Sequence, residues 1–453
     1  MNIEKILAQV PDYESFYTVD ELARHSLALA TAYPGAVKTY SIGASRKGEP
    51  ILCMELGRGA KNAVCFACPH PNEPIGAMTV LTLARILAGD PPLLAELDTT
   101  WYLIPCIDPD ATRLNEGWFK GPFNIENYAR GFYRPAGCEQ VEWTFPIDYN
   151  NRHFNDPIPE TRALMALIEK TRPRFVFSLH NSAFGGAYWY ISKNIPELNP
   201  LLENAARRQD IALHLGEAEA SYSEKYSGAV FSMLSMKRQF DAIDAKDGTP
   251  SERKALSCGT CSGDFIESVC DCLTMMAELP YFSDPKIADT SPSDMTRAEA
   301  IRQKNAVKAE LFGFLGEQFD RVSALFGADN PFPRLVRDCI GYFRSTQNDV
   351  LPAGPEYERA ATVAEKFDNL IVSIKFDILN IALTLRACDM ELARGERFSE
   401  SELKALREAR AACDERVSSM CRELEANTDY SVIEIRRLVS VQLESALHAI
   451  RFC

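Results

Sequence analysis

The chain has 453 residues, of which 46% are hydrophobic and 25% are charged, values typical of a folded globular protein. This length exceeds what one core usually needs and predicts two domains. The formal net charge of -14 argues against nucleic acid or an anionic membrane surface as a partner, because binding to a polyanion needs a basic face.

The N-terminal segment MNIEKILAQVPDYESF carries acidic residues and no long apolar core, so no secretory signal is expected there. No apolar run approaches 18 residues, and no membrane span is predicted. The fourteen cysteines of such a chain indicate reduced thiols and a cytoplasmic location. Cys65 and Cys68 lie in the apolar run AVCFAC and are expected to pack as small hydrophobic residues. Cys258 and Cys261 lie in a Gly/Ser-rich loop, and their redox state is left open.

Apolar runs alternate with helical patterns over the first 285 residues. Runs typical of buried strands occupy 51–57, 62–68, 100–107, 175–180, 187–192 and 272–279, and helical patterns occupy 77–89 and 159–171. This alternation predicts an α/β fold with a largely parallel or mixed sheet covered on both faces. Ligands in such folds gather at the carboxyl ends of the strands, which is where the polar motifs of this chain occur.

The composition changes at 284–296, a stretch rich in Pro, Ser and Asp that is typical of a linker. Helical periodicity follows over 297–326, 357–391, 400–426 and 430–451. We therefore predict an α/β domain over 1–288 and an all-α helical domain over 289–453, which would form a bundle. The expected roles of the second domain are to cover the first, to gate a cleft or to form a homo-oligomer.

Two of the six histidines lie at the ends of predicted buried strands. His70 follows AVCFACP, Glu73 comes three residues later, and His180 ends FVFSLH. Two imidazoles and a carboxylate are a ligand set that zinc prefers, and a catalytic zinc site uses three protein ligands plus an open position. The sequence therefore predicts that His70, Glu73 and His180 hold one zinc ion per chain.

A zinc-bound water also needs a base, a group that polarises a carbonyl and a substrate anchor. Glu278 ends the apolar run CLTMMAEL, so it should face a polar cleft where burial raises its pKa. Arg113 follows a predicted strand in IDPDATR and is a candidate for polarising a carbonyl. Arg152, with Asn151 beside it in DYNNRHF, is a candidate for clamping a carboxylate.

Taken in order, these segments resemble the M14 zinc carboxypeptidases. The matching segments are HPNE (70–73), DPDATR (108–113), NRHF (151–154), SLH (178–180), SGD (262–264) and AELP (277–280). The resemblance implies an α/β/α sandwich around a mixed, mostly parallel eight-stranded sheet, with zinc bound by His70, Glu73 and His180. It also implies that Glu278 is the general base and that Arg113 polarises the scissile carbonyl, while Asn151 and Arg152 hold the terminal carboxylate of the substrate.

The chain departs from the family pattern at two places. One residue is inserted before the Asn-Arg pair, so Asn150 remains an alternative to Asn151. The capping tyrosine that many members carry is missing from KALSCGTCSGD, which leaves open Tyr222, Tyr226 or no phenol at all. Gly263 and Asp264 lie near the place where the family sets side-chain preference.

The predicted function is zinc-dependent removal of C-terminal amino acids from peptides. HPNEPIG and Asn-Arg-x-Phe are also similar to the zinc amidohydrolases of the succinylglutamate desuccinylase and aspartoacylase group, so hydrolysis of N-acyl amino acids is the first alternative. A non-catalytic binding module is the second. Both enzymatic predictions imply a peptide or small amino-acid-derived substrate with a free carboxylate.

Overall fold

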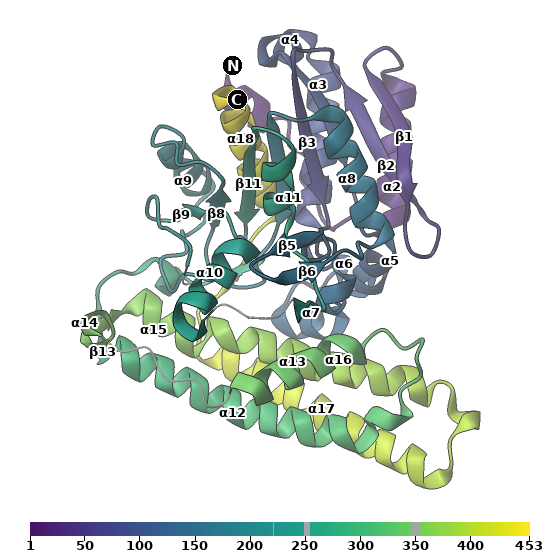
Figure 1. Ribbon diagram of the computed structural model, residues 1–453, viewed down its shortest axis with the longest axis vertical. Helices are drawn as coiled ribbons and strands as arrows, with labels where there is room; N and C mark the ends of the chain where they lie inside the picture. The colour runs from purple at the N-terminus through teal and green to yellow at the C-terminus, as the bar shows by residue number, and fades with distance from the viewer. Residues whose placement is uncertain (221, 249–253, 347–353) are drawn as a thin grey trace.

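A mixed eight-stranded sheet forms the centre of the computed structural model, which describes residues 1–220, 222–248, 254–346 and 354–453 (Figure 1). The strand order is β1-β2-β4-β3-β7-β11-β8-β9. These strands are β1 (Val37–Ala44), β2 (Pro50–Leu56), β3 (Lys61–Ala67), β4 (Thr99–Ile104), β7 (Phe175–His180), β8 (Tyr188–Ile191), β9 (Val230–Ser232) and β11 (Leu273–Glu278). All six strands expected from apolar runs are present, and the predicted α/β architecture is confirmed.

Three small sheets lie outside the main one. Their strands are β5 (Ile147–Tyr149), β6 (Arg152–Phe154) and β10 (Lys254–Ala255); β12 (Phe282–Ser283) and β15 (Ser431–Val432); and β13 (Pro292–Thr296) and β14 (Ala360–Thr362). The pairing of β12 with β15 brings together two segments that are far apart in the sequence.

Helices cover both faces of the main sheet. The helices of this part of the chain are α1 (Ile3–Leu7), α2 (Val19–Ala32), α3 (Ile75–Gly89), α4 (Pro91–Leu97), α5 (Pro109–Thr112), α6 (Glu116–Phe119), α7 (Ile125–Gly131), α8 (Pro159–Thr171), α9 (Asn199–Arg208), α10 (Met236–Asp247) and α11 (Ser262–Val269). Of these, α5, α6, α7 and α10 lie toward the end of the sheet rather than over its faces (Figure 1). Successive residues of β3 point to opposite faces, as strand geometry requires. Cys65 therefore packs in the core that contains α3, whereas Val64 and Phe66 pack with Leu164 of α8.

A layer of helices lies across one end of the sheet (Figure 1). It contains α12 (Arg297–Val322), α13 (Pro333–Thr346), α14 (Pro355–Glu358), α15 (Val363–Leu370), α16 (Lys375–Leu392) and α17 (Glu400–Ala426). The start predicted near residue 400 is confirmed by a capping box between Ser399 and Glu402. The helix expected over 357–391 is instead interrupted twice, by strand β14, which pairs with β13, and by a 3-10 turn at Val372–Ile374, where β-branched residues disfavour a regular helix.

The last helix, α18 (Ile435–Ala449), follows the helical layer in the chain but packs against the sandwich. It contacts α3 and α9, and its residues from Leu438 to Ala449 are all buried. A helix that is buried on every side belongs in a core, which explains why it returns to the sandwich. The predicted division at 288/289 is not tested further and stays a prediction, but the sandwich includes this C-terminal helix.

The topology brings the ends of three neighbouring parallel strands to one edge of the sheet. β7 pairs in parallel with β3 on one side and with β11 on the other. His180 is the last residue of β7 and is in register with Glu278, the last residue of β11. His70 follows β3 by a short turn, so it reaches the same edge.

Within the described ranges, no single helix combines the length and apolar character needed to cross a bilayer, although the bent pair α3–α4 meets the criterion jointly.

Candidate metal centre

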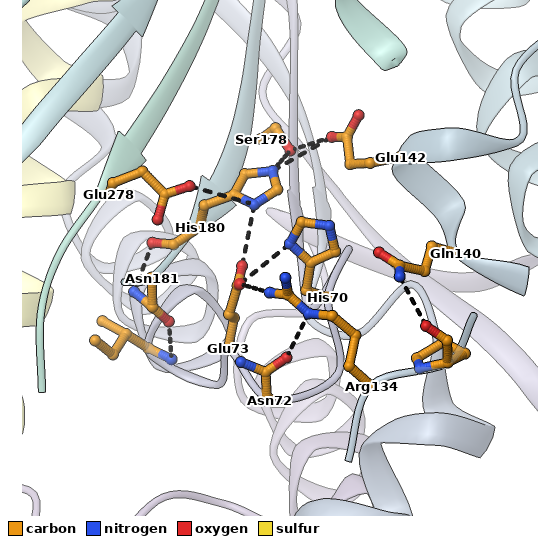
Figure 2. Close-up of polar contacts among 12 residues, drawn as sticks. His70, Asn72, Glu73, Arg134, Gln140, Glu142, Ser178, His180, Asn181 and Glu278 are labelled. Carbon is orange, nitrogen blue, oxygen red and sulfur yellow. Dashed lines mark hydrogen bonds and ion pairs between the residues drawn. The ribbon is translucent and has the colours of Figure 1, made fainter. Parts of the chain in front are cut away.

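The three predicted metal ligands meet in one buried cluster (Figure 2). One ligand atom from each of His70, Glu73 and His180 lies within 4.8 Å of the other two. Nδ1 of His70 is 3.1 Å from Oε1 of Glu73, and Nδ1 of His180 is 3.0 Å from Oε2 of the same carboxylate. A single ion bound by the cluster would be within reach of both rings and the carboxylate.

Two atoms that face the centre of this cluster, Oε2 of Glu73 and Nδ1 of His180, are buried without a hydrogen-bond partner, since their 3.0 Å approach does not have hydrogen-bond geometry. Nδ1 of His70 is on the same side of its ring as Glu73, whereas its Nε2 is buried on the far side, also without a partner (Figure 2). Buried polar atoms are normally satisfied, so this group needs a ligand. Two imidazole nitrogens and a carboxylate oxygen fit zinc.

Glu142 and Ser178 orient the His180 ring from behind. The Ser178 hydroxyl donates to Oε1 of Glu142 at 2.7 Å, so its oxygen accepts from Nε2–H of His180 at 2.7 Å. Oε1 of Glu142 is itself 3.4 Å from Nε2. With the ring proton on Nε2, the lone pair of Nδ1 points toward Glu73, which is the tautomer that a metal ligand needs.

Glu142 is ionised in this position. Burial alone would raise the pKa of Glu142, but His180 and the hydrogen bonds from Ser262 N–H and Ser178 outweigh burial and lower the pKa to about 2. For His180, burial acts to lower the pKa, while Glu142 and Glu73 raise it to about 10. A cation bound at Nδ1 would replace this second proton.

The helix α18 supports the strand end that carries His180. The Gln442 side chain donates to the backbone oxygen of His180 at 3.1 Å and accepts from the Thr79 hydroxyl at 2.7 Å. Gln442 is fully buried, so its amide fixes the position of the β7 terminus against α3.

Arg134 brings a positive charge to the cluster. Its guanidinium contacts Oε1 of Glu73 and donates from Nε to Oδ1 of Asn72 at 3.1 Å. The Asn72 amide in turn donates to the hydroxyl of Tyr128 at 3.1 Å. Arg134 is therefore held beside the metal ligands by a neighbour from the same HPNE turn.

Glu278 lies at the cluster, as the sequence predicts. Its Oε1 is 3.8 Å from Nδ1 of His180, and 14% of its side chain is exposed to solvent. Burial, and then the charge of Glu73, raise the pKa of Glu278 well above its usual range. A divalent cation at the triad would oppose this shift and favour the carboxylate.

The structure does not bring Arg113 into this cluster. Its guanidinium makes hydrogen bonds of 2.6 and 2.8 Å to Glu49 and of 2.7 Å to Asp20. Asp20 lies in the first turn of α2, and Glu49 lies in the turn between β1 and β2. Among the residues described, Arg134 is the arginine that lines the cavity in front of the triad.

Asn151 and Arg152 are also held away from the triad. Arg152 makes two hydrogen bonds, of 2.9 and 2.5 Å, to Asp244 and stacks on Phe240 at 4.6 Å. Asn151 lies in the turn between β5 and β6 with φ of 62°, and Asn150 donates to Asp244 at 3.2 Å. Because Asp244 already satisfies Arg152, the guanidinium is not available to a substrate in this conformation.

A cavity of about 280 Å³ opens in front of the triad and joins the two parts of the molecule. His70, Glu73 and Glu278 form one wall, together with Arg134, Tyr128 and Tyr188. The helical layer forms another wall through Lys304 and Lys308 of α12, Asp368 and Asn369 of α15 and the turn at Val372 and Ser373. The helical region thus encloses the site.

Several residues of the site were not predicted, although the sequence held signals for some of them. Glu142 is flanked by Val141 and Trp143 in EQVEWTF, a weaker form of the signal, a carboxylate among apolar residues, that identified Glu278. Ser178 precedes His180 by two residues, so strand periodicity puts both on one face. Lys304 and Lys308 carried no signal, because only the tertiary fold brings α12 to the cavity.

Asp264, which lies near the family's specificity region, has a structural role in this chain. It accepts from the Ser235 hydroxyl at 2.7 Å and from Met236 N–H at 3.1 Å, and it is buried. Of the tyrosines considered for capping, neither Tyr222 nor Tyr226 is among the described residues that line the cavity. Cys258 and Cys261 are both free thiols.

Residues 24–237 match the family model of the zinc carboxypeptidases. The family resemblance expected from the sequence is confirmed for this part of the chain. The matched segment contains all three residues of the triad, as well as Arg134 and Glu142, and ends before Glu278.

Among characterised relatives, human carboxypeptidase D is 26% identical over 214 residues, which cover 39% of this chain and 15% of that protein. Mouse carboxypeptidase D is 28% identical over 200 residues, which cover 36% of this chain and 14% of that protein. The chain therefore spans only a small part of the length of these relatives. In a solved structure, a metallo-carboxypeptidase from Burkholderia cenocepacia is 16% identical, with a TM-score of 0.34 over 58% of this chain and 60% of that one.

Proposed function

With a zinc carboxypeptidase match over residues 24–237, we propose that this chain is a zinc-dependent hydrolase that removes C-terminal residues from peptides. The observation that carries the proposal is the meeting of His70, Glu73, His180 and Glu278 at the carboxyl ends of three parallel strands, in front of one cavity. The triad would hold the ion, and Glu278 would be left free to exchange protons.

A bound zinc ion supplies a Lewis acid that activates water and polarises a carbonyl oxygen. Glu278 takes a proton from the attacking water as its oxygen bonds to the scissile carbonyl carbon. Glu278 then gives this proton to the leaving nitrogen as the C–N bond breaks, so a carboxylic acid and an amine are released. Burial raises the pKa of Glu278 and so makes its carboxylate a stronger proton acceptor, while a bound cation would moderate this shift.

Arg134 would stabilise the negative charge that develops on the carbonyl oxygen. It is the arginine that lines the cavity beside Glu73, and its hydrogen bond to Asn72 restricts its orientation. A charged donor fixed before the reaction begins stabilises the transition state without further reorganisation. We assign to Arg134 the role that the sequence analysis expected of Arg113.

The first test combines metal content with a peptide panel. Purified protein should hold about one zinc per chain, and His70→Ala or His180→Ala should abolish binding. Glu278→Gln should keep zinc while lowering turnover at least about a hundredfold, the usual scale for losing a general base. Glu219→Gln, at another carboxylate of the same cavity, is the matched control and should retain most of the activity.

The substrates should include free peptides, their C-terminal amides and acetylated or succinylated amino acids. Hydrolysis confined to the N-acyl amino acids would replace the carboxypeptidase proposal with the deacylase alternative. Protein that stays folded and metal-free in the presence of zinc would refute the metal site itself.

A further inference from the structure

The wall of the cavity that belongs to the helical layer carries two lysines. Lys304 and Lys308 are four residues apart on α12, so they share one face of the helix. Both line the cavity that also contains His70, Glu73 and Glu278. Figure 1 shows α12 as part of the layer that crosses the end of the sheet. The layer therefore contributes cationic groups to a site whose metal ligands come from the end of β7 and from the turn that follows β3.

These lysines differ from the other basic residues of the site because neither has a direct ion-pair or hydrogen-bond partner among the described residues. Carboxylates act on them only at longer range, Glu217 and Asp368 on Lys304 and Asp377 on Lys308. Arg134 instead contacts Glu73, and Arg152 is paired with Asp244. Burial lowers the pKa of Lys304, which shows that its amine is partly removed from water. An unpaired, partly desolvated cation in a cavity favours an anionic ligand.

Two acidic residues of the cavity that lie near the lysines, Glu217 and Asp368, are engaged by other groups. Glu217 accepts from Nε of Arg297 at 2.9 Å and from Asn369 at 3.1 Å. Asp368 lies 3.2 Å from Nε2 of His214 and accepts from Glu217 N–H at 2.8 Å. These carboxylates moderate the positive potential near the lysines, but their hydrogen bonds hold them in place.

We propose that Lys304 and Lys308 form an anion subsite that binds a carboxylate of the substrate while its scissile bond lies at the triad. The carboxylate is either the C-terminal one or that of an acidic side chain. This inference rests on the proposed peptidase function and identifies the element that reads the substrate. It transfers the anchoring role expected of Arg152 to α12, outside the segment that matches the zinc carboxypeptidases.

The test uses charge removal on the full-length zinc-loaded enzyme. Lys304→Met, Lys308→Met and the double variant remove the charges and retain the long apolar stem, and Met is a good helix former. Lys304→Arg keeps the charge. Lys404→Met on α17 is the control, since its side chain is 76% exposed and pairs only loosely with Glu408 at 3.9 Å. Zinc content and thermal unfolding should be the same in all five variants.

Matched tripeptides distinguish the two sources of the carboxylate. The first pair, a peptide and its C-terminal amide, tests the C-terminal carboxylate. The second pair, with Glu or Gln as the C-terminal residue, tests a side-chain carboxylate. If the lysines bind a given carboxylate, the double variant should raise the KM of the peptide that carries it at least about tenfold. Its kcat should change less than about threefold, because the contact is present in the ground state and the transition state alike. Lys304→Arg should retain most of the preference, and Lys404→Met all of it.

A second measurement separates failure of the subsite from failure of the peptidase proposal. The affinity of the same peptides is measured by calorimetry in the Glu278→Gln background, which does not depend on turnover, with and without the lysine substitutions. If wild type cleaves none of the peptides, loss of acid-selective binding in the lysine variants would still support the subsite. Lysine variants that keep the wild-type discrimination in both KM and binding would overturn it. Loss of discrimination in Arg152→Ala alone would also overturn it and return the anchor to Arg152.

Discussion

The orientation of His180 by Glu142 provides a sharp test of the metal centre. Glu142→Gln keeps the size of the side chain but replaces a carboxylate oxygen with an amide group that donates. The native carboxylate accepts from Ser178 at 2.7 Å and from Ser262 N–H and Oγ at 2.9 and 3.0 Å. At least one of these donors must then face another donor, and the His180 ring loses its negatively charged neighbour.

The expected loss of zinc affinity is 10-fold to 100-fold, the range for outer-shell partners of a metal-binding histidine, or about 1.4–2.7 kcal/mol. The substitution should also lower the free energy of unfolding, because hydrogen bonds to a charged acceptor contribute about 1.5–3 kcal/mol each. Stability alone cannot distinguish these effects, so a structural control is needed.

Glu203→Gln is that control. Glu203 is also buried and accepts from a serine hydroxyl and a backbone N–H, Ser227 at 2.7 Å and Ala229 at 3.1 Å, but it lies on α9 away from the cavity. Zinc affinity is measured by competition with a chromogenic chelator, and stability by denaturant unfolding of the metal-free proteins. We expect both variants to lose stability and only Glu142→Gln to lose affinity. Equal zinc affinity in Glu142→Gln and wild type would refute the orienting role.

Two further predictions concern the helical layer. Arg386 donates hydrogen bonds of 2.7–2.9 Å to the carbonyl oxygens of Gly131, Phe132 and Leu114. Arg386→Met should therefore lower the free energy of unfolding, measured by thermal unfolding, by at least about 3 kcal/mol. Arg410→Met, at an ion pair on the exposed side of α17, is the control and should lower it by about 1 kcal/mol or less. Burial raises the pKa of Asp377 to about 6, so its ionisation opposes folding as the pH rises from about 4 to 6. Asp377→Asn should therefore raise the free energy of unfolding by up to about 3 kcal/mol at pH 8 and leave it unchanged at pH 4, and a gain that is independent of pH would contradict this reasoning.

The sequence was most informative where buried strands end in polar residues. The runs that end at or just before His70, His180 and Glu278 are apolar because β3, β7 and β11 are covered on both faces, so an ionisable residue at each end is conspicuous. Parallel pairing then makes it predictable that these residues converge. The long amphipathic helices could also be predicted from the sequence, and the start of α17 at its capping box is an example.

The arginines could not be placed in this way, because a long side chain in a loop is directed by partners that local sequence does not identify. Arg113 and Arg152 follow the expected segments, yet each is drawn away by carboxylates distant in sequence, Glu49 and Asp244. Arg134 lies in a loop, Phe132–Arg134, whose backbone is held by Arg386 of α16, a contact between segments far apart in the sequence. Lysines on a helix such as α12 are ordinarily solvated, and the sequence alone does not distinguish Lys304 from its exposed neighbours.

Because β12 pairs with β15, the helical layer is an insertion, here called the cassette, between two adjacent segments of the sandwich. The chain leaves the sandwich after Phe282–Ser283 and re-enters it at Ser431–Val432, and these two segments lie side by side before α18 completes the core. A short turn could bridge them, since joining ends that are already adjacent adds little loop-closure entropy. Excision of the cassette should therefore leave a foldable sandwich that retains the His-Glu-His triad but has an open, less selective cleft. Reaction chemistry and substrate choice would then be separable modules, and grafting a different cassette at this junction offers a route to new specificities.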